Sequence, residues 1–219
     1  INDALNKEFG WTEGAARVYY TLAQDFLYQD ANKNVIFLDN HDLSRYTSMI
    51  DGNMEKFKSG IAFLFTTRGI PSLFYGTEIL MKAWSNPDAK VRIDFPGGWP
   101  NDSINKFKSE GRNVTENEAF NFVKILAGYR RNCKAITQGK LVQFVPENGI
   151  YVYFRYFENQ KLMVIMNTTN KTSEIETSRY AEMIQASTSA VNIINKDILT
   201  DIKHLKLKPN ETLILELAP

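Results

Sequence analysis

Chemically active side chains follow two apolar runs in the first half of the sequence. Asp39, His41 and Asp42 come directly after one run, and Glu78 comes shortly after the other. Carboxylates and imidazoles placed together can exchange protons with a bound molecule or accept hydrogen bonds from its hydroxyl groups. Asp42 and Glu78 would be a candidate pair of acid–base carboxylates if the two runs are neighbouring strands.

The two apolar runs have the pattern of strands in a parallel sheet. Residues 35–38 (VIFL) and 70–75 (IPSLFY) are largely apolar without alternation, which is typical of strands buried on both faces. Helical periodicity precedes each of them, over about 12–29 and 54–65. Because helices alternate with strands, we predict an α/β fold with a parallel sheet, in which ligands meet the carboxyl ends of the strands.

Ordinary structural roles remain open for the same side chains. Asp39 or Asp42 can cap the helix that follows, and His41 can be a partly buried histidine whose hydrogen bonds are all satisfied. The position of all three at a strand end favours the functional interpretation.

The pattern of the sequence changes near residue 132. A third helix, predicted to begin with a capping box at 115–118 (TENE), ends there. Short apolar segments separated by turn residues follow it at 141–145, 150–157, 162–167, 190–194 and 213–217. We therefore predict two parts, residues 1–132 and residues 133–219, the second being a small antiparallel β-sandwich.

Several segments together resemble the α-amylase family of glycoside hydrolases (family 13). Residues 37–46 (FLDNHDLSRY) are similar to the F-x-x-N-H-D motif of the seventh strand of that family's barrel, and residues 69–78 (GIPSLFYGTE) resemble its eighth strand. Residues 92–99 (RIDFPGGW) resemble the loop after that strand in neopullulanases and cyclomaltodextrinases, and residues 1–5 resemble the segment after strand six. The resemblance implies an α/β plus all-β chain: the C-terminal portion of a TIM (β/α)8 barrel, with strands 7 and 8 and helices 6 to 8, followed by the sandwich.

The resemblance also implies a mechanism. Enzymes of this family retain the anomeric configuration: one carboxylate attacks the anomeric carbon, and a second, about 5–5.5 Å away, protonates the leaving oxygen. Both would come from strands that precede Ile1, so we expect the chain alone to be inactive. Asp42 matches the family's third carboxylate, which holds the sugar's 2- and 3-hydroxyls; His41 would donate to the same sugar, and Asn40 would orient the turn. Glu78 matches a supporting residue of the family, which argues against the Asp42–Glu78 pair.

Further residues are predicted to lie near a bound glucan. Arg45 and Tyr46 closely follow the N-H-D motif and are predicted to contact the substrate. Trp84 and Trp99 flank the loop after the second strand, where they can stack on sugar rings or anchor the loop. Arg92 can pair with a carboxylate of the site or hold its own loop in place.

Two other functions are compatible with the sequence. A glucanotransferase of the same family would pass the glycosyl group to a sugar instead of water. A non-catalytic starch-binding module in the sandwich would use exposed aromatic side chains, for which Tyr151, Tyr153 and Tyr156 are the candidates.

Composition limits the partners. A formal net charge of +1 and the lack of an apolar run of about 20 residues argue against nucleic acid and membrane as partners. The single cysteine, Cys133, is predicted to be a structural thiol, and no metal-binding cluster or cofactor motif is visible, although calcium is expected in some full-length relatives. We expect an α-glucan as the ligand, and either a missing N-terminal portion or homo-association to cover the open sheet. A periplasmic or cytoplasmic bacterial location fits the family.

Overall fold

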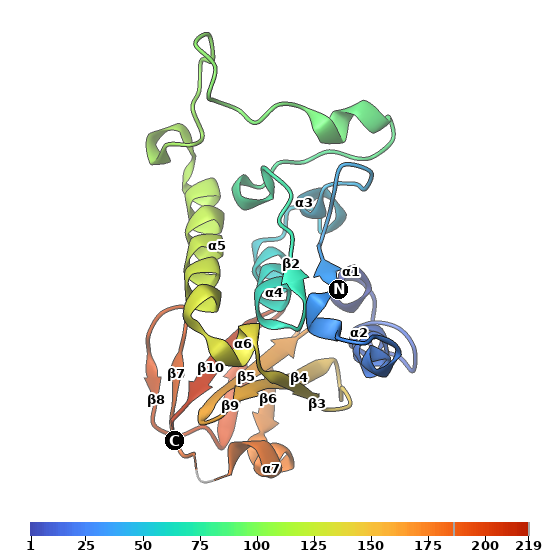
Figure 1. The fold of residues 1–219 in the computed structure, drawn as a ribbon, viewed down its shortest axis with the longest axis vertical. Helices are drawn as coiled ribbons and strands as arrows, with labels where there is room; N and C mark the ends of the chain where they lie inside the picture. The colour runs from blue at the N-terminus through green and yellow to red at the C-terminus, as the bar shows by residue number, and fades with distance from the viewer. Residues whose placement is uncertain (186, 219) are drawn as a thin grey trace.

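The first part of the chain consists of helices, two short strands and long loops, as seen in the computed structural model, which describes residues 1–185 and 187–218 (Figure 1). Its α-helices and strands are α1 (Asn2–Asn6), α2 (Ala15–Ala23), β1 (Val35–Ile36), α3 (Tyr46–Met49), α4 (Met54–Thr66), β2 (Ile70–Pro71) and α5 (Val114–Asn132). Its 3-10 helices are η1 (Asp25–Leu27), η2 (Ala31–Lys33), η3 (Thr77–Ile79), η4 (Asp88–Arg92) and η5 (Ser109–Gly111).

The two predicted strands lie side by side and run parallel. Val35 is opposite Ile70, and Ile36 is opposite Pro71. The pairing is shorter than the apolar runs predict. The last hydrogen bond between the two strands runs from Ser72 N to Ile36 O at 2.8 Å, and beyond it both segments continue as loops. Both chain segments therefore deliver their loops to the same edge of the small sheet.

The first predicted helix is shorter than its apolar periodicity indicates. The α-helix begins only after Gly14, whose φ of 60° is unfavourable for other residues, and where a Cβ atom would lie 2.8 Å from the Glu8 carbonyl oxygen. Phe26, inside the predicted helix, and Trp11, just before it, are exposed on either side of α2. The periodic pattern therefore extends beyond the helix itself.

The next two helices match their predicted positions and are fixed by side-chain caps. Asn53 caps α4 by accepting from the Lys56 N–H at 3.0 Å. The capping box of α5 consists of Asn113 and Glu116, two residues earlier than predicted. Asparagine is as good a cap as threonine, so a cap at Asn113 satisfies both ends of the box and adds Val114 and Thr115 to the helix.

The second part of the chain is built on a six-stranded antiparallel sheet with the order β3-β4-β5-β10-β7-β8. Its strands are β3 (Lys140–Gln143), β4 (Ile150–Phe157), β5 (Gln160–Asn167), β7 (Ala190–Asn192), β8 (Ile198–Leu199) and β10 (Thr212–Leu217). A second sheet pairs β6 (Ser173–Glu176) with β9 (His204–Leu207). Short helices complete this part: α6 (Lys134–Thr137), η6 (Thr177–Tyr180) and α7 (Ala181–Ile184).

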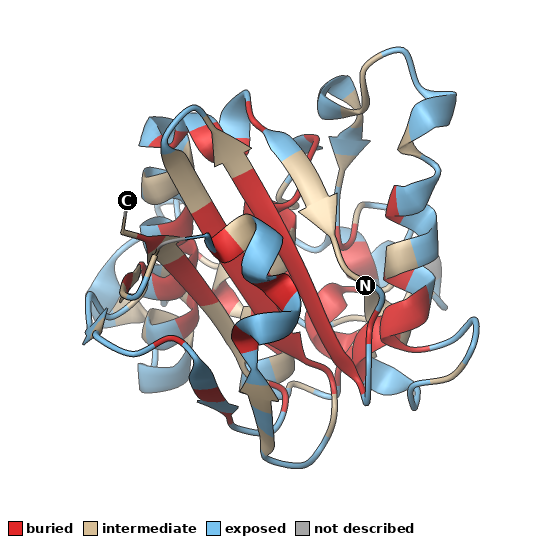
Figure 2. Cartoon of the chain, turned by 90° about the horizontal axis from the view of Figure 1, so that it is seen from below, coloured by how far each residue is buried: buried red, intermediate tan, exposed pale blue. Residues whose placement is uncertain are grey.

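The six-stranded sheet is covered on both faces and its inner strands are buried (Figure 2). On β4, Tyr151 and Tyr153 pack in the core that includes α2, α4 and α5, whereas Val152 and Phe154 pack in a second core beneath β6 and β9. Alternate residues of a strand point to opposite faces, so both sets are buried. The predicted antiparallel sandwich is confirmed, with helices as an additional layer.

The core that joins the two parts is continuous across residue 132. Cys133 ends α5, is buried, and has its pKa raised by that burial. Ser59 of α4 donates to the Asn210 carbonyl oxygen at 2.6 Å, which ties α4 to the start of β10. The division at residues 132 and 133 stays a prediction about domains, because the described residues pack as one body at this point.

Candidate functional site

The edge of the β1–β2 sheet carries the predicted chemical groups on two adjacent loops. The first loop contains residues 39–45 and the second contains residues 72–85. They are joined by backbone and side-chain contacts: Arg45 N donates to the Ala83 carbonyl oxygen at 2.9 Å, and Ser44 and Ser85 hydroxyls lie 3.1 Å apart. The loops after the two strands thus form one structural unit.

Asn40 sets the turn that displays the next two residues. Its Oδ1 accepts hydrogen bonds from Asp42 N at 2.9 Å and Leu43 N at 3.0 Å, which is the Asx-type turn that asparagine favours. His41 and Asp42 project from this turn with side chains that are 65% and 62% exposed. His41 Nε2 lies 3.3 Å from Asp42 Oδ2, so the two groups form a polar pair open to solvent.

Arg92 reaches this pair from a third segment, η4. Its Nη2 lies 3.1 Å from Asp42 Oδ1, and its Nε donates to the His41 carbonyl oxygen at 2.9 Å. Both roles considered for Arg92 are therefore present at once: it pairs with the carboxylate and it anchors its own loop.

Beneath the exposed pair, Asp39 anchors the turn from inside. Its carboxylate accepts from Tyr46 N at 2.8 Å and from the Thr77 hydroxyl at 3.1 Å. The side chain is buried, and burial raises the pKa of Asp39, partly opposed by the hydrogen bonds from Tyr46 N–H and Thr77. The helix-capping interpretation thus applies to Asp39, whose acceptor binds the first residue of α3, and not to the exposed Asp42.

Arg45 and Tyr46 are buried, which corrects the prediction that they contact a substrate. Arg45 is 1% exposed and Tyr46 is 0% exposed, so neither presents a surface to a bound molecule. The Arg45 guanidinium lies 4.0 Å from the ring centre of Phe74, stacks also on Tyr75, and donates to the Tyr75 carbonyl oxygen. The Arg45 side chain thus joins the two loops from inside, and the Tyr46 hydroxyl donates to the Lys56 carbonyl oxygen of α4 at 2.8 Å.

Glu78 is also directed into the protein. Its Oε2 is enclosed and has no hydrogen-bond partner among the described residues, and burial raises the pKa of this carboxyl group. The structure therefore gives no support to Glu78 as the second member of a catalytic pair.

A pocket of about 610 Å³ lies beside the site, behind the turn that carries Asp42. Trp84 lines it together with Asp51, Lys82 and Lys90, and the Trp84 side chain is more than half exposed. His41 and Asp42 are not among its lining residues. The Asp42 carboxylate therefore lies outside this pocket. Of the residues predicted to contact a glucan, Trp84 is one that lines it. Trp99, in the loop after η4, is also exposed but does not line this pocket.

The tyrosines proposed for a starch-binding sandwich do not form a surface. Tyr151 and Tyr153 are buried in the core, and Tyr151 donates to Gln143 Oε1 at 2.6 Å. Only Tyr156 of the three is partly accessible. This correction follows from the sheet having both faces covered.

Two features that the sequence interpretation missed support the site. Tyr75 donates its hydroxyl to the Ile93 carbonyl oxygen at 2.8 Å, which fixes η4 above the second strand. Gly60 of α4 allows the Tyr46 ring to lie against the helix, because a Cβ atom there would be 2.0 Å from the Tyr46 hydroxyl oxygen. A glycine inside an otherwise apolar helix was the available signal for such a close contact.

The described residues contain no group of three or more His, Cys, Asp or Glu side chains arranged to hold a metal ion. Among the helices that the structure describes, none has the length and apolarity that crossing a bilayer requires.

Two known protein families match most of the chain. Residues 11–112 match the family described as alpha amylase, catalytic domain, and residues 141–216 match the cyclo-malto-dextrinase C-terminal domain. The chain belongs to the α-amylase family. The N-H-D turn and the β1–β2 pair lie within the first matched segment, and the six-stranded sheet with the β6–β9 sheet lies within the second.

Individual relatives of this α-amylase family chain are longer proteins. A cyclomaltodextrin glucanotransferase of Bacillus sp. (strain 38-2) is 29% identical over 175 residues, which are 79% of this chain and 22% of that protein. An α-amylase of Niallia circulans is 30% identical over 140 residues, which are 64% of this chain and 23% of that protein. The chain thus spans about a fifth of the length of the curated relatives it matches.

Solved structures show that the whole chain has the α-amylase fold. The structure of the Geobacillus thermoleovorans α-amylase in complex with acarbose superimposes on 100% of this chain and 46% of that one, with a TM-score of 0.77 and 19% identity. The β1–β2 pair with its helices is accordingly part of a TIM-barrel catalytic domain, and the antiparallel sheets form the C-terminal domain, as the resemblance implied.

Proposed function

We propose that this chain supplies the sugar-holding carboxylate of a retaining enzyme that cleaves α-1,4 or α-1,6 bonds in an α-glucan such as starch, maltodextrin, pullulan or cyclodextrin. The observation that carries the proposal is the exposed Asp42 carboxylate at the carboxyl end of the parallel strand pair, with His41 Nε2 3.3 Å away. The membership of the chain in the α-amylase family and the oligosaccharide in the complex of the Geobacillus thermoleovorans enzyme support this choice of ligand.

The chemistry of the pair suits a sugar with two adjacent hydroxyl groups. A carboxylate accepts hydrogen bonds from both hydroxyls, and an imidazole N–H donates one to a sugar oxygen. As the ring flattens toward an oxocarbenium ion, its hydroxyls become better donors, so the carboxylate binds the transition state more tightly than the ground state. In this role Asp42 lowers the barrier without forming a bond to the sugar.

Arg92 must exchange partners for Asp42 to act in this way. In the structure its guanidinium occupies Asp42 Oδ1. Both side chains are exposed, so this ion pair is weak, and a sugar that offers two hydroxyls can replace it. The hydrogen bond from Arg92 Nε to the His41 carbonyl keeps the loop in place during that exchange.

The chain on its own is proposed to be inactive as a glycosidase. A retaining mechanism requires two carboxylates about 5–5.5 Å apart that both reach the scissile bond. Asp42 is the exposed carboxylate of the site, and Glu78 is turned inward with an enclosed oxygen. The nucleophile and the acid–base residue would come from other strands of the barrel.

A glucanotransferase is the second candidate, because the relatives include both cyclomaltodextrin glucanotransferases and an α-amylase. Both reactions share the glycosyl-enzyme intermediate and differ in whether water or a sugar hydroxyl attacks it. Product analysis of an enzyme that includes this chain separates them: a transferase yields cyclic or lengthened glucans from maltoheptaose, and a hydrolase yields shorter linear ones.

Binding to the chain itself tests the proposal directly. We expect maltoheptaose to bind weakly, with chemical-shift changes at the His41 and Asp42 amides, and Asp42→Asn to weaken binding at least fivefold. Asp201→Asn is the matched control, since Asp201 lies in the exposed turn before β9 and its asparagine analogue can still accept from Lys203 N. Equal binding by the native chain and the Asp42 variant would show that this carboxylate does not hold the sugar.

A further inference from the structure

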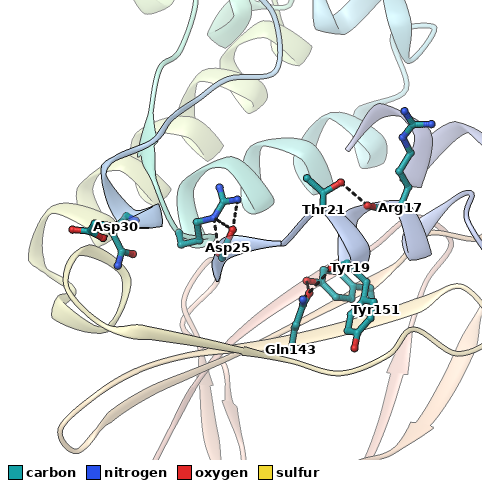
Figure 3. Close-up of polar contacts among 9 residues, drawn as sticks. Arg17, Tyr19, Thr21, Asp25, Asp30, Gln143 and Tyr151 are labelled. Atoms are coloured by element: carbon teal, nitrogen blue, oxygen red, sulfur yellow. Dashed lines mark hydrogen bonds and ion pairs between the residues drawn. The ribbon is translucent and has the colours of Figure 1, made fainter. Parts of the chain in front are cut away.

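A second polar pocket, of about 360 Å³, lies where η1 and η2 meet the beginning of β3. Its lining includes three cationic side chains, Arg68, Lys140 and Arg155, and one carboxylate, Asp25. Figure 3 shows part of this region, with Asp25 on η1 and Gln143 on β3 below it. The pocket belongs to the opposite end of the strands from Asp42, because η2 directly precedes β1.

The only carboxylate that lines this pocket is already used by one of the arginines. Arg68 Nε lies 2.9 Å and 2.8 Å from the two carboxylate oxygens of Asp25, and Arg68 Nη2 lies 2.7 Å from Oδ1 (Figure 3). This bidentate pair neutralises one positive charge. Lys140 and Arg155 therefore leave the lining with an excess of two positive charges.

Arg155 is the most unusual of these groups, because it is 0% exposed and has only neutral partners. Its Nε donates to the Ala135 carbonyl oxygen at 3.2 Å, and its Nη2 donates to those of Ile136 and Gly139 at 2.7 Å and 2.8 Å. Its Nη1 is buried and has no hydrogen-bond partner among the described residues. Burial, with the nearby Arg130 charge, lowers the pKa of Arg155 to about 10.

A buried cation without a counter-charge is costly, because carbonyl dipoles replace only part of its lost hydration. Arg68 and Arg130 increase that cost, since both lie close enough to repel the Arg155 charge. A bound anion would offset this cost by supplying the missing counter-charge. The planar N–H fork of a guanidinium matches the oxygens of a phosphate-like group, and charge-assisted hydrogen bonds of this kind are among the strongest in proteins.

We propose that this pocket, lined by Arg68, Lys140 and Arg155, binds a small tetrahedral oxyanion such as phosphate. Asn32 adds an amide group to the lining, with its Oδ1 3.5 Å from Arg155 Nη2. The anion would link η2, just before β1, with the start of β3, and so stabilise the contact between the barrel part and the C-terminal sheet. This proposal stands apart from the proposed function, because no residue of the glucan site lines the pocket.

Thermal unfolding of the purified chain at pH 7.5 tests the proposal. We expect 20 mM phosphate to raise Tm by roughly 4–7 °C in a saturable manner, which corresponds to a Kd of about 1 mM. Sulfate should act in the same way, since it shares the tetrahedral oxyanion shape. Sodium chloride at matched ionic strength should give less than half of the shift, and calorimetric titration with phosphate should return the same Kd.

A charge reversal at the exposed edge of the pocket keeps the test independent of folding. Lys140 is exposed on β3, so Lys140→Glu should fold, and we expect it to weaken phosphate binding at least fivefold. Lys124→Glu makes the same charge change on the exposed face of α5, outside the pocket, and should keep the full phosphate response. An equal response to chloride, a non-saturable response, or full phosphate binding by the Lys140 variant would each overturn the proposal.

Discussion

The guanidinium of Arg92 lies against the carboxylate of Asp42, with Nη2 3.1 Å from Oδ1, although fifty residues separate them in the sequence. The same guanidinium donates to the carbonyl oxygen of His41. One side chain from η4 therefore contacts both the backbone and the charged group of the N-H-D turn, and the turn is held from outside by Arg92 and from inside by Asp39.

Removing the Arg92 side chain should loosen the turn without unfolding the protein. Exposed ion pairs contribute about 0–1 kcal/mol, so Arg92→Ala should lower Tm by no more than about 3 °C. Hydrogen exchange of the Asp42 and Leu43 amides, both bound to Asn40 Oδ1, should become several times faster. Lys90→Ala, on the same 3-10 helix, serves as the control and should change neither quantity. Unchanged exchange in the Arg92 variant would count against this account.

Gly60 should tolerate no side chain, because its missing Cβ makes room for Tyr46. A Cβ atom at this position would be 2.0 Å from the Tyr46 hydroxyl oxygen. We expect Gly60→Ala to lower the free energy of unfolding by about 2–3 kcal/mol through overpacking. Gly128→Ala is the matched control in α5, where nothing lies within 4 Å of the added atom. It should raise the free energy of unfolding by about 0.5–1 kcal/mol, and urea titration measures both.

Local chemistry made part of this structure predictable from the sequence. The turn at Asn40 follows from the ability of asparagine to bind its own backbone, and the central strands β4 and β5 follow from largely apolar runs. The burial of Arg45 was not predictable in this way. It depends on Phe74 and Tyr75, which lie thirty residues away and whose rings cover the guanidinium only in the folded protein.

The small β6–β9 sheet was missed for a different reason. Its strands are rich in charged residues, and His204 is exposed. The period-two pattern in β9, with Leu205 and Leu207 buried and His204 and Lys206 exposed, was nevertheless present in the sequence. The lysines suggested a solvated segment, whereas a strand that covers a sheet exposes every second side chain.

Glu78 should make the stability of the protein depend on pH. Burial raises the pKa of this carboxyl group above its ordinary value of 4.5, so the folded protein favours the protonated form. The contribution of Glu78 is therefore complete below the unfolded-state pKa and is lost as the pH rises through the folded-state pKa. Glu78→Gln stays neutral, so its stability relative to the native chain should rise between pH 4 and pH 8, as measured by urea unfolding.

The control for this pH profile is a carboxyl group shifted in the opposite direction. Backbone hydrogen bonding and the Ser109 hydroxyl lower the pKa of the exposed Glu110. Glu110→Gln should therefore show no gain in relative stability as the pH rises. A flat profile for the Glu78 variant would indicate that this carboxyl group is hydrated in solution.

Arg130 should be the residue of α5 that fixes this helix to the end of α4 and to the turn into β2. Its Nη1 donates to the Phe65 carbonyl oxygen at 2.9 Å and its Nη2 to that of Gly69 at 2.5 Å, so one side chain satisfies the end of α4 and the turn into β2. Hydrogen bonds from a charged donor contribute about 1.5–3 kcal/mol each, and loss of the arginine would also leave buried carbonyl groups unsatisfied.

We therefore expect Arg130→Met to lower the free energy of unfolding by about 2–4 kcal/mol. Arg131→Met is the adjacent control, because Arg131 is exposed and should change the stability by no more than about 0.5 kcal/mol. Hydrogen exchange should locate the effect: the Ile70 amide, which donates to the Asn34 carbonyl oxygen, should lose protection before the amides of β4 do. If Arg130→Met and Arg131→Met unfold at the same urea concentration, the hydrogen bonds of Arg130 do not hold α5 to the end of α4 and the turn into β2.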